Sequence, residues 1–285
     1  MKIVLNKYLN KIKFIIKNDK VLFFQIVLLL LLLLVIYRGF HHLPDKTEIN
    51  EILMNSKQKN LYIIDVGHGY TGECKGNHVK LEDGSCFYEY QYCYDLYKKI
   101  DIMLKKSNIF SILLDTNVLV QNMPINTRVR EVNNIVRKVN RANITTLVIS
   151  LHANYTSKNP DATGVEVYIN LEKQKNILDA SLYNEAMTNA AILFANNLAH
   201  YSGLPLRKSR GKEYKLSELR PEDCGILKRT KCYAILTENG FFSNEKERNK
   251  MQTDKFKTNI AYAHYASICE IEGIIPYPIN IFYEQ

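Results

Sequence analysis

The stretch Leu61–Gly69, LYIIDVGHG, decides the fold. It opens with an apolar run interrupted only by Asp65, and the run ends at His68, which stands between two glycines. A short apolar run bounded by turn-forming residues is typical of a buried strand. The stretch therefore predicts a strand that carries His68 at its carboxyl end.

Two later stretches have the same design. Leu147–Asn154, LVISLHAN, carries His152 near its end, and Tyr233–Gly240, YAILTENG, carries Glu238. Open parallel sheets place their working residues just beyond the carboxyl ends of the strands. The three stretches thus predict one pocket, and imidazoles together with carboxylates in one pocket favour a zinc ion.

Apolar runs alternate with amphipathic helical stretches from residue 60 onward, which predicts an α/β fold. We expect one domain with a mostly parallel twisted sheet flanked by helices. The expected strands are 61–66, 109–114, 145–151, 164–169 and 233–238, and the expected helices are 89–106, 125–140, 181–203 and 246–272. The connections 70–88 and 204–230 show no clear pattern, and we expect them to form the walls of a cleft at the edge that bears the polar residues.

The net charge of +9 does not indicate a nucleic-acid partner. Residues 1–40 account for most of it, because they contain seven cationic side chains and a single acidic one, Asp19. The rest of the chain is close to balanced, and its most basic stretch, 207–229, also contains acidic residues. A nucleic-acid-binding surface needs a concentrated basic patch, so we expect no nucleic acid as a partner.

The segment Val21–Tyr37, VLFFQIVLLLLLLLVIY, is apolar apart from one glutamine. A cleaved signal peptide would also combine a basic start with an apolar core, but this core is long and no small-x-small site follows it. The excess of lysines before it predicts a single-pass anchor in the cytoplasmic membrane, with the amino terminus inside and the catalytic part on the periplasm or wall side. The expected organisation is 1–20 basic cytoplasmic terminus, 21–40 signal anchor, 41–59 stalk and 60–285 catalytic domain.

Six cysteines are present, and none form a C-x-x-C pair, so a cysteine zinc site is not expected. In an exported domain, Cys74 with Cys86 and Cys224 with Cys232 can each close a short loop as a disulfide. Six unbridged thiols are the equally weighted alternative.

A hydrolytic zinc needs three protein ligands and an open position for water. His68 and His152 supply two of them. The third is Glu73, Glu82 or Glu89, of which we favour Glu89 because it begins a predicted helix. Its alternative role is to interact with that helix dipole. Glu238 is the candidate general base, because a carboxylate at the end of an apolar strand is costly unless a cation or another partner is near.

These residues resemble the zinc-dependent N-acetylmuramoyl-L-alanine amidases of the type-3 family. The resemblance spans approximately residues 60–274 and also includes Arg128 followed by Asn133, and Arg210-Gly211. The segments that carry it are Ile64–Gly69, Glu89, Ser150–Asn154, Gly164–Tyr168 and Thr237–Asn244. The chain departs from the family in a longer stretch between His68 and Glu89, and in having Asn239 where the family has an aliphatic residue.

The resemblance implies one Zn²⁺ held by His68, Glu89 and His152, with Glu238 as the catalytic base. It also implies that Asn154 and Arg210 contact the substrate, peptidoglycan. The implied reaction hydrolyses the amide between N-acetylmuramic acid and the L-alanine of the stem peptide, in wall remodelling or host lysis. The alternatives are another zinc peptidase or esterase with the same ligands, or a catalytically silent wall-binding module.

Overall fold

The computed structural model describes Leu28 and residues 59–139, 144–170, 180–207 and 224–283. The chain divides into two compact units, residues 1–43 and 44–285, and the account below concerns the second. Within the described residues, no helix combines the length and the apolar character needed to cross a bilayer. The predicted anchor, 21–40, lies outside the described residues except for Leu28 and stays a prediction.

A five-stranded sheet forms the centre of the second unit, in the order β4-β1-β5-β7-β6. The neighbouring pairs are parallel except at the edge, where β6 runs antiparallel to β7. The five strands are β1 (Asn60–Val66), β4 (Ser111–Leu113), β5 (Thr145–Asn154), β6 (Glu166–Tyr168) and β7 (Tyr233–Phe241). Because β1, β5 and β7 lie side by side in parallel, their carboxyl ends meet at one edge of the sheet.

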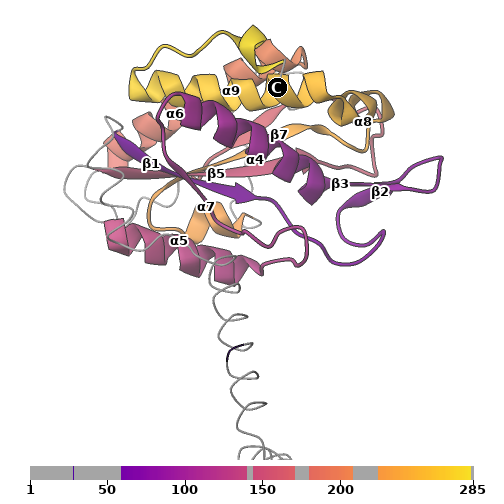
Figure 1. Ribbon diagram of the computed structural model, residues 1–285, viewed down its shortest axis with the longest axis horizontal. Helices are drawn as coiled ribbons and strands as arrows, with labels where there is room; N and C mark the ends of the chain where they lie inside the picture. The colour runs from indigo at the N-terminus through magenta and orange to yellow at the C-terminus, as the bar shows by residue number, and fades with distance from the viewer. Residues whose placement is uncertain (1–27, 29–58, 140–143, 171–179, 208–223, 284–285) are drawn as a thin grey trace, which may run out of the picture. The chain divides into compact units, whose positions relative to one another are not determined.

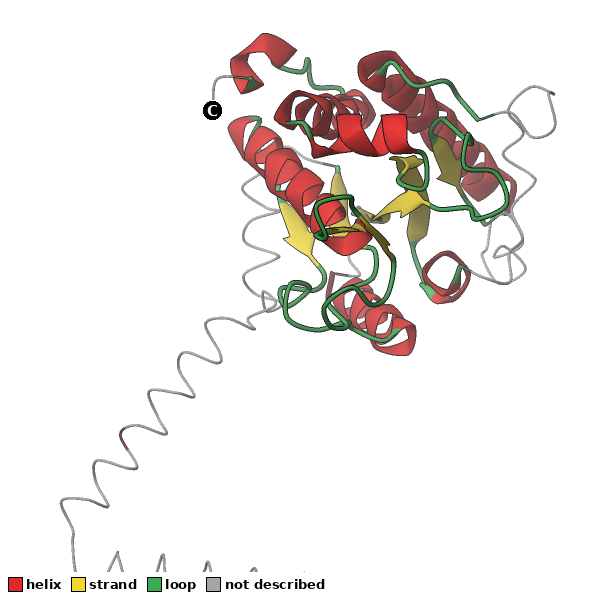
Figure 2. Ribbon diagram, turned by 90° about the vertical axis from the view of Figure 1, so that its right-hand side faces the viewer, coloured by secondary structure: helices red, strands yellow, loops and turns green. Residues whose placement is uncertain are grey.

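Helices cover both faces of this sheet, as Figures 1 and 2 show. One face carries α4 (Glu89–Lys106), α6 (Ala180–Ser202) and α9 (Asp254–Glu272). The opposite face carries α5 (Ile125–Val139) and the short α7 (Gly225–Arg229). The remaining elements are the hairpin β2 (His78–Lys80) and β3 (Cys86–Tyr88), α8 (Glu245–Gln252) and the 3-10 helix η4 (Ile279–Phe282).

The sequence pattern explains these elements. Residues 61–66 of β1 are all buried, as expected for a parallel strand with helices on both faces. The helix α4 buries a stripe at helical spacing, which packs against α9 and the sheet: Tyr92, Cys93, Leu96, Ile100 and Met103. Glycine ends α9, where Gly273 adopts a left-handed φ of 72°.

The predicted α/β fold, with one domain and a mostly parallel sheet between helices, is confirmed. The prediction of one helix over 246–272 was wrong in detail, because the chain forms two helices that meet at Thr253. The backbone of Thr253 is extended, and its hydroxyl accepts a hydrogen bond from the amide of Phe256, which starts α9 afresh. The connections 70–88 and 204–230, whose sequences show no clear pattern, also contain regular elements, namely the hairpin β2–β3 and helix α7.

Candidate metal and catalytic site

Three side chains with metal-ligand atoms meet at the carboxyl edge of the sheet. The ligand atoms of His68, Glu89 and His152 all lie within 4.8 Å of one another. The rings of the two histidines stand nearly perpendicular, with their centroids 5.1 Å apart. The structure therefore brings the two predicted histidines together with Glu89, the favoured one of the three predicted glutamates.

Glu89 reaches the strand ends because it is the first residue of α4. Its Oε1 accepts hydrogen bonds from the Ala153 amide at 3.0 Å and from His152 Nδ1 at 2.9 Å. Its Oε2 lies 3.4 Å from Nε2 of His68. The carboxylate is buried, whereas the side chain of His68 is 41% exposed. The cluster is thus open to solvent on the His68 side.

Backbone shape at the end of β1 explains the two glycines around His68. His68 itself has a left-handed φ of 59°, an uncommon conformation for a residue with a side chain. A Cβ on Gly67 would come within 2.5 Å of the His152 ring, and one on Gly69 within 2.4 Å of the Gln121 carbonyl oxygen. The two glycines therefore make room for the second histidine and for a neighbouring loop.

Arg128 of α5 holds the loop that carries His68. Its guanidinium donates to the carbonyl oxygens of Val66 and His68, and to Asp65 Oδ1 at 2.5 Å. Ser150 donates to the other oxygen of Asp65 at 2.7 Å. Arg128 and Asp65 are both buried, so this pair fixes the backbone from Val66 to His68.

Burial and mutual charge set the protonation of the three side chains. Burial lowers the pKa of His68, partly opposed by Glu89. At His152 burial acts in the same direction, but the hydrogen bond and charge of Glu89 outweigh it and raise the pKa to about 9. The pKa of Glu89 is lowered, because the two histidines overcome the effect of its burial. A proton shared between Glu89 and His152 is what a metal ion would replace.

Glu238 lies directly opposite His152 in the β5–β7 register. Its Oε2 is buried and has no hydrogen-bond partner among the described residues. Burial raises the pKa of Glu238 to about 8; His152 opposes this shift, while the charges of Glu89 and Glu166 add to it. A buried carboxylate oxygen without a partner is costly, so it marks a place where a ligand or a proton is expected.

A cleft of about 870 Å³ opens in front of these groups, on the side of the sheet covered by α5 and α7. Its lining includes His68, His152 and Glu238 from the strand ends. The facing wall includes Arg128 of α5 and Ile226 and Arg229 of α7. We expected the connection 204–230 to form a wall of the cleft, and its helix α7 does so.

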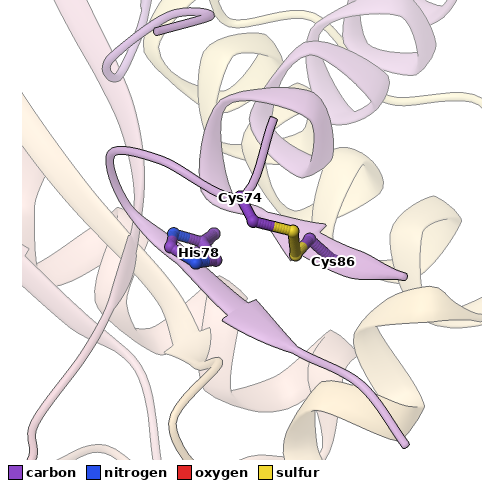
Figure 3. Close-up of side chains that lie close together, drawn as sticks. All are labelled: Cys74, His78 and Cys86. Atoms are coloured by element: carbon purple, nitrogen blue, oxygen red, sulfur yellow. A yellow bond between two sulfur atoms is a disulfide. The ribbon is translucent and has the colours of Figure 1, made fainter. Parts of the chain in front are cut away.

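The first connection forms the hairpin β2–β3, which a disulfide between Cys74 and Cys86 closes (Figure 3). The hairpin presents Asn77, whose Nδ2 donates to Nε2 of His68 at 2.7 Å and to Oε2 of Glu89 at 2.8 Å. The carbonyl oxygen of Asn77 accepts from the Glu89 amide at 3.1 Å. Sequence reasoning missed Asn77, because only the pairing of the hairpin brings it to the ligands.

The other predicted residues lie as follows. Glu73 and Glu82 are exposed on the hairpin segment, outside the cluster. Asn154 donates from Nδ2 to Glu166 Oε2 at 2.6 Å, and Arg210 lies outside the described residues. Of the two expected disulfides only Cys74–Cys86 is confirmed; Cys224 and Cys232 are not joined to each other.

An α/β fold that places two imidazoles and a carboxylate at the carboxyl ends of parallel strands, with a further carboxylate beside them, is typical of a metal-dependent hydrolase. The donor set fits a divalent ion, because its three ligand atoms converge and Glu238 offers a buried oxygen without a partner. A family model of N-acetylmuramoyl-L-alanine amidases matches residues 63–270. The chain belongs to this family and is a peptidoglycan amidase.

Solved structures of such amidases share the fold. The catalytic domain of CwlV from Bacillus (Paenibacillus) polymyxa var. colistinus is 21% identical at a TM-score of 0.55, covering 76% of this chain and 99% of its own. Ami1 from Mycobacterium smegmatis is 15% identical at a TM-score of 0.56, and the match covers 77% of this chain and 99% of Ami1. CwlD from Clostridioides difficile, solved in complex with the GerS lipoprotein, is 18% identical at a TM-score of 0.54. This match covers 74% of this chain and 96% of CwlD. A search of the curated proteins found no match.

Proposed function

We propose that the amidase works with one Zn²⁺ held by His68, Glu89 and His152, and with Glu238 as the general base. One observation carries the proposal: three ligand atoms converge within 4.8 Å beside a carboxylate that stands opposite one of the ligands in the strand register. Two imidazoles and one carboxylate form a ligand set of hydrolytic zinc, which leaves a position for water and substrate.

The reaction is hydrolysis of the amide between the lactyl group of N-acetylmuramic acid and L-alanine. When bound, Zn²⁺ would polarise the attacking water and stabilise the negative charge that develops on the amide carbonyl oxygen. Glu238 accepts a proton from the attacking water, since its Oε2 has no other partner among the described residues. Glu238 then donates this proton to the leaving nitrogen of L-alanine, so the base is regenerated as the amide bond breaks.

Asn154 and Arg210 are the proposed substrate contacts. Asn154 stands two residues beyond His152, and its partner Glu166 lies opposite Glu238 in the β6–β7 register. This position beside the base supports a contact with the peptide stem. The proposal for Arg210 rests on the sequence resemblance.

We place the enzyme at the cytoplasmic membrane, with the catalytic domain on the outer side. The support is the basic start of the chain followed by the apolar segment 21–37. Peptidoglycan is the substrate, and a tether would confine cleavage to the part of the wall that lies close to the membrane.

Digestion of purified peptidoglycan tests the proposal. The purified chain should release stem peptides with free L-alanine amino termini; a chelator should stop this release, and added Zn²⁺ should restore it. Cleavage that continues unchanged in the chelator would exclude the metal. New amino termini on residues other than L-alanine would instead indicate a peptidase.

A further inference from the structure

Asn239 follows Glu238 directly but lies on the other face of the sheet, toward α9. The register of β5 and β7 pairs His152 with Glu238 and then Asn154 with Phe241, so Asn239 and Gly240 stand opposite Ala153 alone. This extra residue is a β-bulge, which interrupts the regular ladder next to His152. The side chain of Asn239 is fully buried at this interruption.

The amide of Asn239 bridges three elements. Its Nδ2 donates to the carbonyl oxygens of His152 at 2.9 Å and of Thr237 at 3.2 Å. These two acceptors fix which end of the amide is the nitrogen, so Oδ1 faces Nε2 of His264 on α9 at 3.0 Å. His264 must therefore be the donor in this bond. Burial lowers the pKa of His264 to about 3, so the ring is neutral and carries its proton on Nε2.

We propose that Asn239, held by His264, is a positioning residue for the metal ligand His152. The amide supplies a hydrogen-bond donor to the His152 carbonyl where the bulge interrupts the ladder, and it thereby fixes the backbone that aims the imidazole. The inference rests on the proposed function, because it takes His152 to be a ligand.

A buried polar pair can also be simply part of the packing, and the experiment has to separate the two roles. Replacing Asn239 alone would leave His264 buried without any partner, since its Nδ1 already has none among the described residues. That variant would lose stability for a trivial reason. Replacing both partners by leucine removes the donor to His152 without leaving the imidazole unpaired, and such paired replacement can be nearly neutral for stability.

The test compares Asn239→Leu/His264→Leu with a matched control, Asn197→Leu/Ser267→Ala. The control also removes a hydrogen bond from α9, the 2.9 Å bond from Asn197 Nδ2 to Ser267 Oγ, but it does not touch the β5–β7 bulge. The measurements on the full chain are urea unfolding, zinc affinity by competition with a chromophoric chelator, and the visible absorption of the Co²⁺-loaded enzyme, which reports ligand geometry.

We expect the Asn239/His264 variant to fold, to bind zinc about tenfold more weakly and to show a shifted Co²⁺ spectrum. The control should keep the affinity and spectrum of the parent chain. If the Asn239/His264 variant folds with parental zinc affinity and an unshifted spectrum, the positioning role is wrong. If it does not fold, the same measurements on Asn239→Gln, whose longer side chain moves the amide away from the His152 carbonyl, must show the spectral shift or the proposal is also wrong. Failure of the parent chain to bind zinc would overturn the proposed function instead.

Discussion

Glu238 combines two properties that rarely occur together in a side chain with only a structural role. It is a carboxylate in the last part of β7, where its neighbouring residues are buried, and one of its oxygens has no hydrogen-bond partner among the described residues. Burial favours its protonated form, whereas the adjacent imidazole of His152 favours the charged form. A group balanced in this way can both accept and return a proton near neutral pH.

Replacing Glu238 by Gln should therefore lower the rate of hydrolysis by about a hundredfold or more, while zinc stays bound. The amide keeps the size of the side chain but cannot accept the proton of water. The measurements are release of L-alanine amino termini and zinc content after dialysis. Hydrolysis at the parental rate would rule out Glu238 as the base.

Glu89→Ala should lose zinc, because it removes the proposed ligand, which also bonds His152 and the Ala153 amide. Metal content measured after gel filtration reports the loss. Glu73→Ala and Glu82→Ala are matched controls, since both glutamates are exposed on the same segment and lie outside the cluster. Zinc retained by Glu89→Ala and lost by either control would reassign the third ligand.

The positions of His68, His152 and Glu238 could be predicted from the sequence for a physical reason, and Glu89 was favoured because it begins a predicted helix. His68, His152 and Glu238 each end an apolar run, and parallel strands bring such ends to one edge. Asn77 and Asn239 could not be predicted. The first depends on how a hairpin pairs, and the second depends on a bulge and on a helix that follows later in the chain.

At the scale of elements, the hairpin β2–β3 is what distinguishes the region between His68 and Glu89. Its pairing is short, from His78 with Tyr88 to Lys80 with Cys86. A two-stranded hairpin is marginally stable by itself, so a covalent link is expected to matter here. The disulfide also fixes the segment before Asn77, where the Cys74 amide donates to the Tyr88 hydroxyl at 2.8 Å.

Replacing Cys74 and Cys86 by Ser should lower the free energy of unfolding by at most about 3 kcal/mol, the chain-entropy value for a loop of this length. Amide hydrogen exchange should rise at Leu81 and Gly84, whose amides bond within the hairpin. Exchange in β1 and β5 should not change, because those strands are held by the sheet. Equal acceleration in the strands and the hairpin would contradict a local role.

The sequence predicted most elements, and its errors have local causes. Periodicity found α4 and the three central strands, since each carries a continuous apolar signal. It joined α8 to α9 because no glycine or proline separates them in the sequence, and only the extended backbone of Thr253 interrupts the helix. It missed β2, β3 and α7 because these elements are short and, unlike β4 and β6, do not lie within a longer run of apolar or alternating residues.

At the scale of the whole molecule, the site joins parts of the fold that lie far apart in sequence. Glu89 comes from α4 on one face of the sheet and Arg128 from α5 on the other. His68 lies just beyond the end of β1, and His152 lies in the neighbouring strand β5. The stability of the domain and the protonation of the site are therefore linked. That linkage gives the metal-free protein a measurable pH dependence.

The free energy of unfolding of the metal-free chain should fall as the pH rises from about 6.5 to about 9, whereas below 6.5 the low pKa of His264 acts in the opposite direction. The pKa of Glu238 rises on folding from 4.5 to about 8, and that of His152 from 6.5 to about 9. In each interval the folded chain keeps a proton that the unfolded chain has lost, so stability declines with pH. Urea unfolding in a chelator measures this slope. Glu238→Gln should flatten it below pH 8, and an unchanged slope would contradict the assignment.

The position of Asn77 has a consequence for the rate at which the metal-free enzyme binds zinc. Its amide occupies the lone pairs of His68 and Glu89, so it must leave before zinc can bind both side chains. In stopped-flow mixing, the rate of zinc uptake should therefore reach a ceiling as the zinc concentration increases. Asn77→Ala should remove that ceiling and make uptake simply proportional to concentration. A linear dependence in the parent chain would mean that Asn77 does not delay the arrival of the metal.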